Sequence, residues 1–402
     1  MALIVQKFGG SSVADAQRIF HVAEIITKTY QQGNSVCVVL SAQGDTTDDL
    51  IEKAREINPD ASRREMDMLL SCGEQMSIAL MAMAIEKLGF PVVSLCAWQI
   101  GMATDSNHSA AHITKVDCER VKEELDRKRI VLAAGFQGVD RTGDITTLGR
   151  GGSDTTAVAL AVALQADLCQ IYTDVDGVYT SDPRIVPEAR KLSEITYDEM
   201  LELASMGAQV LHNRSVELAK SYGVQLEVLS SFTGNPGTIV KEVVKKVEKT
   251  YITGVAQDKK IARFALVGLE DVPGVAYKLF NLLAKDKINV DMIIQSLGHD
   301  ERKDIIFTVA DKDSMACARL LDENKDVLKY DHMDINTGVS KVSIVGAGML
   351  ENAGVAAKMF EALYQAHINI HMISTSEIKV SVLIDKEDSD RAVRVIHNQF
   401  FQ

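Results

Sequence analysis

Residues Gly149–Thr156 (GRGGSDTT) carry the strongest chemical signal in the chain, directly before the apolar run Ala157–Leu164. Glycines let a backbone approach a ligand closely, and a Ser/Asp/Thr cluster is typical of a helix start, where the first N–H groups lack partners. Such a start binds anions, and the planar guanidinium of Arg150 can grip a carboxylate or a phosphate. By itself, the segment is equally typical of an ordinary capped helix after a turn.

A second glycine loop, Lys7–Ser12 (KFGGSS), follows an apolar run and precedes a helix-like stretch. Gly9 and Gly10 remove side-chain bulk where backbone amides can meet phosphate oxygens, and Lys7 supplies a mobile positive charge. The chain contains no Gly-x-x-x-x-Gly-Lys-Ser/Thr motif, so this is not a Walker loop. A tight strand–helix turn explains the glycine pair equally well.

Composition narrows the class of protein. A length of 402 residues predicts two or three domains, and 46% hydrophobic residues predict a sizeable interior. No apolar stretch reaches the ~18–20 residues of a membrane span and no signal peptide is evident, so we expect a cytoplasmic protein without membrane contact. Six scattered cysteines without a Cys-x-x-Cys pair predict reduced thiols. The net charge of −13 argues against nucleic-acid binding, and anionic substrates would need a locally positive site.

Up to about residue 240, short β-rich runs alternate with helical stretches, which predicts a doubly wound, mostly parallel α/β sheet. The expected strands are Ala2–Val5, Val36–Leu40, Val92–Leu95, Ile130–Ala134, Leu168–Tyr172 and Leu226–Leu229. The expected helices are Val13–Tyr30, Arg64–Leu88, Lys115–Lys128, Thr155–Gln165 and Val216–Ser221. Ligands bind such sheets at the C-terminal strand ends, which here lead into loops Gln6–Ser12, Ser41–Thr47, Gly135–Gly152 and Thr173–Asp182.

After Lys241–Lys249 an internal repeat appears. Gly274–Phe280 (GVAYKLF) aligns with Gly354–Phe360 (GVAAKMF), and Ile288–Ile293 aligns with Ile368–Ile373 at the same offset of 80 residues. Two matches in one register predict a duplicated unit.

Each repeat is expected to run strand, helix, strand, strand, helix. These elements are Ala262–Leu269, Val275–Lys285, Asn289–Leu297, Asp304–Val309 and Ser314–Glu323 in the first repeat, and Lys341–Val345, Val355–His367, Asn369–Ser374, Ile378–Ile384 and Ser389–Gln399 in the second. Val327–Tyr330 is the expected fourth strand of the first repeat. The second repeat has no room for one, so we expect Tyr251–Val255 to complete its sheet. The predicted domains are therefore 1–240, 260–335 and 336–402, the last with strand 251–257.

Five segments are best interpreted together: Lys7–Ser11, Ser41–Asp48, Gly73–Gln75, Gly149–Asp154 and Tyr172–Arg184. Together they resemble the amino-acid kinase family and within it the aspartate kinases, and the duplicated unit looks like the paired ACT domains of such kinases. The resemblance implies an amino-acid kinase fold followed by two ferredoxin-like βαββαβ ACT domains. It also implies transfer of the γ-phosphoryl group of ATP to the β-carboxylate of L-aspartate, giving 4-phospho-L-aspartate. This is the first step of lysine, threonine and methionine biosynthesis, with end-product inhibition.

The resemblance also implies roles for individual residues. Lys7 and Asp154 would be catalytic, with Lys7 bridging the transferred group, and Mg²⁺ would be carried by ATP rather than by a protein metal site. Arg150 would grip the substrate α-carboxylate, Glu74 its ammonium group, and Thr47 would add a hydrogen bond. Gly151, Gly152, Ser153 and Asp154 would complete the aspartate site. ATP would contact Lys7, Phe8, Gly9, Gly10, Ser41, Thr173, Asp174, Tyr179, Asp182 and Arg184.

Effector binding would lie mainly in the first repeat, between paired ACT domains of two subunits in a homodimer or higher oligomer. Lysine, threonine or both would contact Asp271, Gly274, Ala276, Asn289, Val290, Asp291 and Gln295, with Asn369, Ile370 and Thr375 contributing from the second repeat. Val247 lies where some relatives begin a separately translated regulatory subunit, and we treat that as a hypothesis.

Three alternatives remain. Acetylglutamate, glutamate and UMP kinases share the family, but the Ser41–Asp48 loop, Glu74 and the duplicated tail disfavour them. An inactive amino-acid sensor is disfavoured by the intact set of Lys7, Arg150 and Asp154. The repeats could also serve only as a structural dimerisation module.

Overall fold

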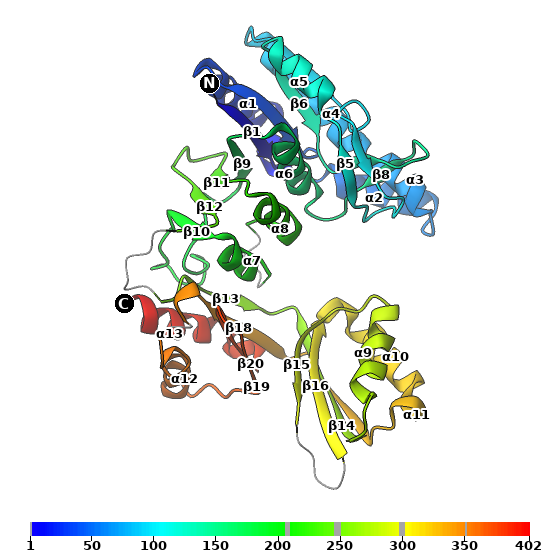
Figure 1. Ribbon diagram of the computed structural model, residues 1–402, viewed down its shortest axis with the longest axis vertical. Coiled ribbons are helices and arrows are strands. Elements are labelled where there is room, and N and C mark those ends of the chain that lie inside the picture. Colours follow the sequence, from blue (N-terminus) through cyan, green and yellow to red (C-terminus); the bar gives the residue numbers. More distant parts are fainter. Residues whose placement is uncertain (1, 206–209, 245–250, 297–301, 350–351) are drawn as a thin grey trace. The chain divides into compact units, whose positions relative to one another are not determined.

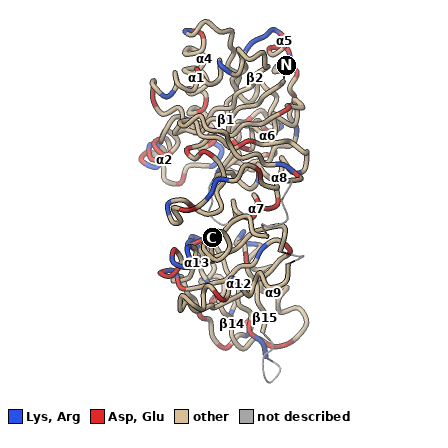
Figure 2. Tube along the Cα trace, turned by 90° about the vertical axis from the view of Figure 1, so that its left-hand side faces the viewer, with Lys and Arg blue, Asp and Glu red and all other residues tan. Residues whose placement is uncertain are grey.

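The computed structural model describes residues 2–205, 210–244, 251–296, 302–349 and 352–402, so Val247 lies outside the described residues. The chain divides into two units (Figure 1). The first comprises Met1–Tyr179 and Arg190–Lys246, and the second comprises Thr180–Ala189 and Val247–Gln402. Acidic and basic residues are interspersed along both units (Figure 2).

An eight-stranded sheet forms the centre of the first unit, in the order β10-β12-β11-β9-β1-β2-β6-β3. Its strands are β1 (Leu3–Phe8), β2 (Ser35–Leu40), β3 (Val92–Leu95), β6 (Ile130–Ala134), β9 (Leu168–Thr173), β10 (Glu194–Thr196), β11 (Leu226–Ser230) and β12 (Thr238–Lys241). β11 and β12 run antiparallel, and the other neighbouring pairs run parallel. The predicted mostly parallel sheet is therefore confirmed, whereas the short strands β10, at the edge, and β12, next to it, were missed.

The helices of this unit are α1 (Ala16–Gln31), α2 (Thr46–Ile57), α3 (Arg63–Leu70), α4 (Cys72–Lys87), α5 (Glu119–Asp126), α6 (Gly152–Leu164), α7 (Tyr197–Ser205) and α8 (Asn213–Tyr222). Phe8, Val38 and Leu40 share one core cluster with side chains of α1 and α4. Because side chains alternate along a strand, Lys7 points to the opposite face from Phe8. That face carries α6, which contacts β1, β2 and β9.

A second sheet of four short strands was not predicted. It has the order β5-β4-β7-β8, with β4 (Met102–Thr104), β5 (Ile113–Val116), β7 (Gln137–Val139) and β8 (Ile145–Thr147). Strands of three or four residues are too short to show an alternating pattern, so 135–152 was expected to be only a loop. The expected helix from Lys115 begins at Glu119 instead.

One continuous helical stretch, Arg63–Lys87, is long and apolar enough to cross a membrane by length and composition alone. Core helices of soluble proteins pass the same test. Half of its most apolar window is buried, its α4 part contacts β3 and β6, and the charged Glu74 is buried within it. We therefore interpret it as a core helix of the first unit.

The second unit contains the two repeats, each with a four-stranded antiparallel sheet. The first repeat comprises β14 (Ile261–Glu270), α9 (Val275–Lys285), β15 (Val290–Gln295), β16 (Arg302–Ala310), α10 (Ser314–Glu323), α11 (Lys325–Leu328) and β17 (His332–Asn336). The second comprises β13 (Gly254–Asp258), β18 (Val339–Val345), α12 (Val355–Gln365), β19 (Met372–Thr375), β20 (Lys379–Asp385) and α13 (Ser389–Phe401).

Corresponding strands occupy corresponding places in the two sheets, β15-β16-β14-β17 and β19-β20-β18-β13. β13 precedes the first repeat in the chain but pairs with β18 of the second. This confirms the prediction that a strand upstream of the first repeat completes the sheet of the second. The first repeat is thus inserted within the second.

Two expectations about this unit need correction. Val327–Tyr330 is not a strand: α11 ends at Leu328, Lys329 has a left-handed φ of 55°, and the fourth strand is β17. Thr180–Ala189 was assigned to the catalytic domain but belongs to the second unit. There Val186 is buried in one core with Ile252 and Val255, so hydrophobic packing and not sequence order decides its place.

Candidate active site

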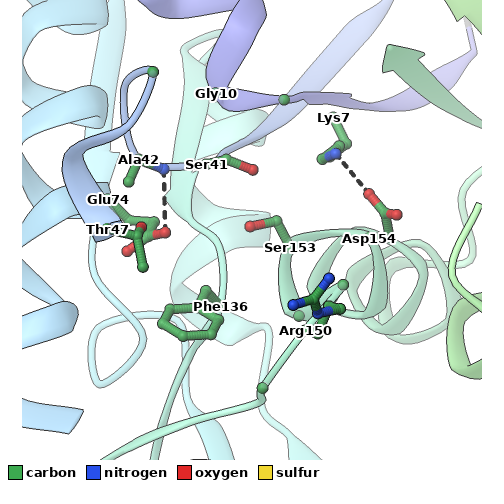
Figure 3. Close-up of a pocket in the computed structure, with 15 residues that line it drawn as sticks. Lys7, Gly10, Ser41, Ala42, Thr47, Glu74, Phe136, Arg150, Ser153 and Asp154 are labelled. Carbon is green, nitrogen blue, oxygen red and sulfur yellow. Dashed lines mark hydrogen bonds and ion pairs between the residues drawn. The ribbon is translucent and has the colours of Figure 1, made fainter. Parts of the chain in front are cut away.

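A cavity of about 330 Å³ lies in the first unit. It is formed where strands β1, β2 and β6 end and where the segment after β8 enters α6. It is lined by Lys7, Gly9, Gly10, Ser41, Ala42, Gly44, Thr47, Glu74, Phe136, Gly149, Arg150, Gly151, Gly152, Ser153 and Asp154 (Figure 3). These residues come from three of the four loops that the sequence predicted as site-forming, together with the starts of α4 and α6.

Lys7 and Asp154 form an ion pair on one side of this cavity (Figure 3). Lys7 Nζ lies 2.7 Å from Asp154 Oδ1, and each side chain is 12% exposed. Lys7 stands near the end of β1, whereas Asp154 stands in the first turn of α6. The pair is therefore oriented at the cavity wall, and its limited contact with water strengthens the attraction of the ammonium group for an anion.

Gly10 allows the loop after β1 to meet the loop after β2. A Cβ at Gly10 would lie only 2.5 Å from the carbonyl oxygen of Ala42. The backbone N–H of Gly44 donates to the carbonyl oxygen of Gly10 at 3.0 Å, which holds the two loops together. A side chain at position 10 would force these loops apart and open the cavity.

The start of α6 forms the floor of the cavity. Gly151 caps the helix with a φ of 70°, and a Cβ there would lie 2.2 Å from Cγ of His212. The first N–H groups of an α-helix have no intrahelical acceptors and carry partial positive charge. Arg150 is exposed immediately before this start. A guanidinium and a helix N-terminus thus converge where an anion can bind.

Glu74 lies across the cavity from the ion pair, beside Thr47 (Figure 3). It is 3% exposed; Oε1 accepts a hydrogen bond from the backbone N–H of Ala42 at 3.1 Å, and Oε2 has no hydrogen-bond partner among the described residues. Burial raises the pKa of Glu74 to about 7, and the bond from Ala42 opposes that rise. A buried carboxylate oxygen without a partner is well suited to receive a cationic group of a ligand.

Several residues predicted for ATP do not line the cavity. The side chain of Phe8 is fully buried and stacks on Tyr172, with ring centroids 4.4 Å apart. Thr173 Oγ1 donates to Asp174 at 3.0 Å, and Tyr179 Oη donates to Asp176 at 2.7 Å. Asp182 and Arg184 pair with each other at 2.7 Å and belong to the second unit. Phe8, Thr173, Asp174 and Tyr179 of the first unit are therefore not among the residues that line the cavity.

Four lining residues were given no individual role from the sequence: Ala42, Gly44, Phe136 and Gly149. All four lie in loops that were predicted to form the site. Phe136 has a φ of 67°, a left-handed conformation that a bulky residue rarely adopts. Its position two residues after the buried strand β6 was the available signal.

Two of the candidate effector residues in the second unit, Asp271 and Asp291, form ion pairs within that unit. Asp271 pairs with Lys303 at 3.0 Å, and Asp291 of the first repeat pairs with Lys341 of the second. Gly274 caps α9 with a φ of 96°, next to Ala276 in its first turn. Asn289, Gln295, Asn369 and Thr375 are exposed, whereas Val290 and Ile370 are half-buried.

Comparison with known proteins agrees with this architecture. The model of the amino acid kinase family matches residues 2–230, and an ACT-domain model matches 264–324 and 342–400. The chain thus combines an amino acid kinase unit with two ACT domains. It is 48% identical over 400 residues to an aspartokinase of Bacillus sp. (strain MGA3) and 50% identical over 405 residues to one of Mycolicibacterium smegmatis. These alignments cover 100% of this chain and 97% and 96% of the two relatives.

Solved structures agree as well. The structure of E. coli aspartokinase III in complex with aspartate and ADP matches with a TM-score of 0.84 and 26% identity, covering 100% of both chains. The aspartate kinase from Synechocystis matches with a TM-score of 0.57 and 45% identity, covering 99% of this chain and 69% of that one. The chain belongs to the aspartokinase branch of the amino acid kinase family.

Proposed function

We propose that this protein is a cytoplasmic enzyme that transfers the γ-phosphoryl group of ATP to the β-carboxylate of L-aspartate, giving 4-phospho-L-aspartate for lysine, threonine and methionine biosynthesis. The observation that carries the proposal is the pairing of Lys7 with Asp154 on one side of a cavity whose other groups are Glu74 and Arg150. The charges of Lys7, Glu74 and Arg150 are opposite to those of a phosphoryl group, an ammonium group and a carboxylate, respectively.

Aspartate would bind between Arg150 and Glu74. The guanidinium of Arg150 can hold the α-carboxylate through two parallel hydrogen bonds, with help from the N–H groups of Gly151 and Gly152. The free Oε2 of Glu74 would accept a hydrogen bond from the substrate ammonium, and Thr47 would add another contact. This orientation leaves the β-carboxylate pointing toward Ser153 and Asp154.

Phosphoryl transfer then requires two anions to approach each other. An oxygen of the β-carboxylate attacks the γ-phosphorus, the bond between that phosphorus and the bridging oxygen breaks, and ADP leaves with the electron pair. Lys7 Nζ neutralises charge on the moving group, while Asp154 keeps the ammonium group in place. Catalysis of this kind rests on positioning and charge stabilisation and needs no covalent protein intermediate.

The phosphates of ATP would lie against Gly9, Gly10 and Ser41 of the cavity. The proposed neighbours of the base are Thr173, Asp174, Tyr179, Asp182 and Arg184. Among the described residues that line the cavity, the carboxylates are Glu74 and Asp154, and Asp154 is held by Lys7. This donor set fits Mg²⁺ carried on the nucleotide phosphates better than a protein cage. When bound there, Mg²⁺ would neutralise charge on the β- and γ-phosphates.

Regulation would occur in the second unit. We propose that lysine, threonine or both bind near Asp271, Gly274 and Asp291, between ACT domains of two copies of the chain. A solved E. coli aspartokinase III complex contains lysine and aspartate, and it matches this chain with a TM-score of 0.79 at 26% identity. The exposure of the candidate residues supports a site that a second copy covers.

A separately translated regulatory fragment beginning near Val247 remains a hypothesis. Intact-mass analysis of purified protein tests it directly. A C-terminal species of about 150 residues would support the hypothesis, and its absence would remove it.

The decisive test is trapping of the acyl phosphate with hydroxylamine, which yields aspartyl hydroxamate only if the β-carboxylate has been phosphorylated. We expect product with ATP, Mg²⁺ and aspartate, and less product when lysine and threonine are added separately or together. Acetylglutamate, glutamate and UMP serve as competing acceptors. Product from one of them but not from aspartate would refute the proposal.

A further inference from the structure

Arg150 is carried by a short segment that has little support of its own. Gly149 and Gly151 on either side of it both have left-handed φ angles, of 76° and 70°. Only these two glycines and Arg150 itself separate Leu148, just after β8, from Gly152, the first residue of α6. The place from which the guanidinium reaches the cavity is therefore set by whatever holds Leu148 and Gly151.

Asp67 of α3 holds the end of β8. Its carboxylate is completely buried, and it accepts hydrogen bonds from the backbone N–H of Thr147 at 3.0 Å and from Thr147 Oγ1 at 2.7 Å. It also accepts from the N–H of Ser109 at 2.9 Å and contacts His108 Nδ1 at 3.0 Å. No lysine or arginine pairs with Asp67 in the part of the chain that the structure describes. A buried carboxylate is unfavourable unless its oxygens are hydrogen-bonded. These hydrogen bonds therefore fix the backbone at Thr147 and at Ser109.

Arg214 in the first turn of α8 holds the next residue. Its Nη1 donates to the carbonyl oxygen of Leu148 at 3.1 Å, and its Nη2 donates to that of Ala111 at 2.9 Å. An arginine is unfavourable at the positive end of a helix, so its position there indicates a tertiary role. The neighbouring His212 packs against Gly151, where a Cβ would lie 2.2 Å from the ring. The start of α8, through Arg214 at Leu148 and His212 at Gly151, thus supports the Arg150 segment at both ends.

We propose that Asp67 and Arg214 are positioning residues for the substrate carboxylate, acting through the backbone that carries Arg150. The carboxylate of Asp67 binds the N–H of Thr147, in the peptide group that joins Thr146 to Thr147. The guanidinium of Arg214 binds the carbonyl of Leu148, in the peptide group that joins Leu148 to Gly149, so two oppositely charged side chains orient two nearby peptide groups. Neither residue lines the cavity. The inference rests on the proposed role of Arg150 in binding the α-carboxylate of aspartate.

Kinetic constants of Arg214→Lys test the proposal. Lysine keeps the charge but lacks the fork that bridges two carbonyls. We expect the KM for aspartate to rise about tenfold, because a charged hydrogen bond to the backbone is lost, with the KM for ATP within about twofold of the wild type. Arg129→Lys is the matched control, since Arg129 pairs with Glu124 at 2.9 Å and does not line the cavity. An unchanged KM for aspartate, or an equal rise in both KM values, would overturn the proposal.

A double variant separates action through Arg150 from an independent effect. If Arg214 acts through Arg150, Arg150→Lys combined with Arg214→Lys should have a KM for aspartate within about twofold of Arg150→Lys alone. Multiplication of the two single effects would contradict the proposal. Asp67→Asn should behave like Arg214→Lys; if it does not fold, Thr147→Val removes only the Oγ1 hydrogen bond and should give a smaller rise in the same constant. Formation of aspartyl hydroxamate by the wild-type protein tests the proposed function, and it does not depend on any of these variants. A failure of the proposed function is therefore distinguishable from a failure of this inference.

Discussion

The candidate active-site cavity and the candidate effector site differ in how far their acidic and basic side chains are exposed to water. In the cavity, Glu74 is 3% exposed and the Lys7 side chain 12%, and all the lining residues come from one unit. In the effector site, the side chain of Asp271 is 55% exposed and that of Asp291 is 43% exposed. Charge interactions are strong where water is excluded and weak at an exposed surface.

This difference in exposure indicates how many copies of the chain each site needs. One copy of the chain supplies the buried groups that we propose for phosphoryl transfer. The exposed effector residues, in contrast, can bind a small amino acid tightly only if another surface covers them. The proposed pairing of ACT domains between two copies would supply that surface.

The largest expected effect comes from Lys7→Met, which tests the buried side of the comparison. Removing the ammonium group should lower kcat by about 10²–10³-fold, because charge on the transferred group is no longer neutralised. Binding of ATP, measured by calorimetry, should change little. Lys28→Met, an exposed lysine in the last turn of α1, is the control. Near-normal turnover of Lys7→Met would remove the catalytic role.

Arg150→Lys should give the next largest effect. The charge is kept, but the paired hydrogen bonds to a carboxylate are lost. We expect the KM for aspartate to rise roughly 10–100-fold with a smaller change in the KM for ATP. Arg55→Lys on the exposed face of α2 is a matched control. A wild-type KM for aspartate would show that another group binds the α-carboxylate.

Glu74 should make aspartate binding depend on pH. Because burial raises its pKa to about 7, the carboxyl group of the free enzyme is protonated below that pH and ionised above it. Only the ionised form attracts the substrate ammonium, so the KM for aspartate should fall about tenfold between pH 6 and pH 8. In Glu74→Gln this KM should be high and independent of pH across the same range. A pH-dependent KM in that variant would assign the titration to another group.

The same residue gives a stability prediction with a defined sign. The folded-state pKa lies above the ordinary value of 4.5, so the folded protein binds a proton more tightly than the unfolded chain. Stability from this group is therefore present below pH 4.5 and is lost as the pH rises through 7. Urea titration should show that Glu74→Gln gains stability relative to the wild type between pH 5 and pH 8. A constant difference across that range would refute the raised pKa.

The smallest expected effect tests the exposed side of the comparison. Asp291→Asn should raise the lysine or threonine concentration needed for half-inhibition about three- to tenfold, because one charged contact to the effector is lost. The matched control is His371→Asn, since His371 occupies the corresponding position of the second repeat and pairs with Asp385 there. Equal effects of the two variants would place effector binding in both repeats.

Much of the fold and of the site was predictable because local patterns carried it. The buried strands β2 and β6 have continuous apolar runs, and the glycine-rich loops after β1 and β8 are distinctive by composition. The duplicated segment even predicted that β13 completes the second sheet. In contrast, β4, β5, β7 and β8 are three or four residues long and show no periodicity. Thr180–Ala189 was placed with the first domain because it follows that domain's strands in the sequence, whereas the segment packs in the second unit.

The sequence by itself determined the family, the parallel sheet, the duplicated repeats and the residue types proposed to meet the substrates, since these depend on local pattern and order. Only the tertiary structure decided which of those residues meet. It paired Lys7 with Asp154, 147 positions further along the chain, and left one oxygen of Glu74 facing the cavity. It also set Asp67 and Arg214 around the segment that carries Arg150. The reason is physical: such contacts depend on strand register and on burial in a shared interior, and neither is encoded in any short stretch of sequence.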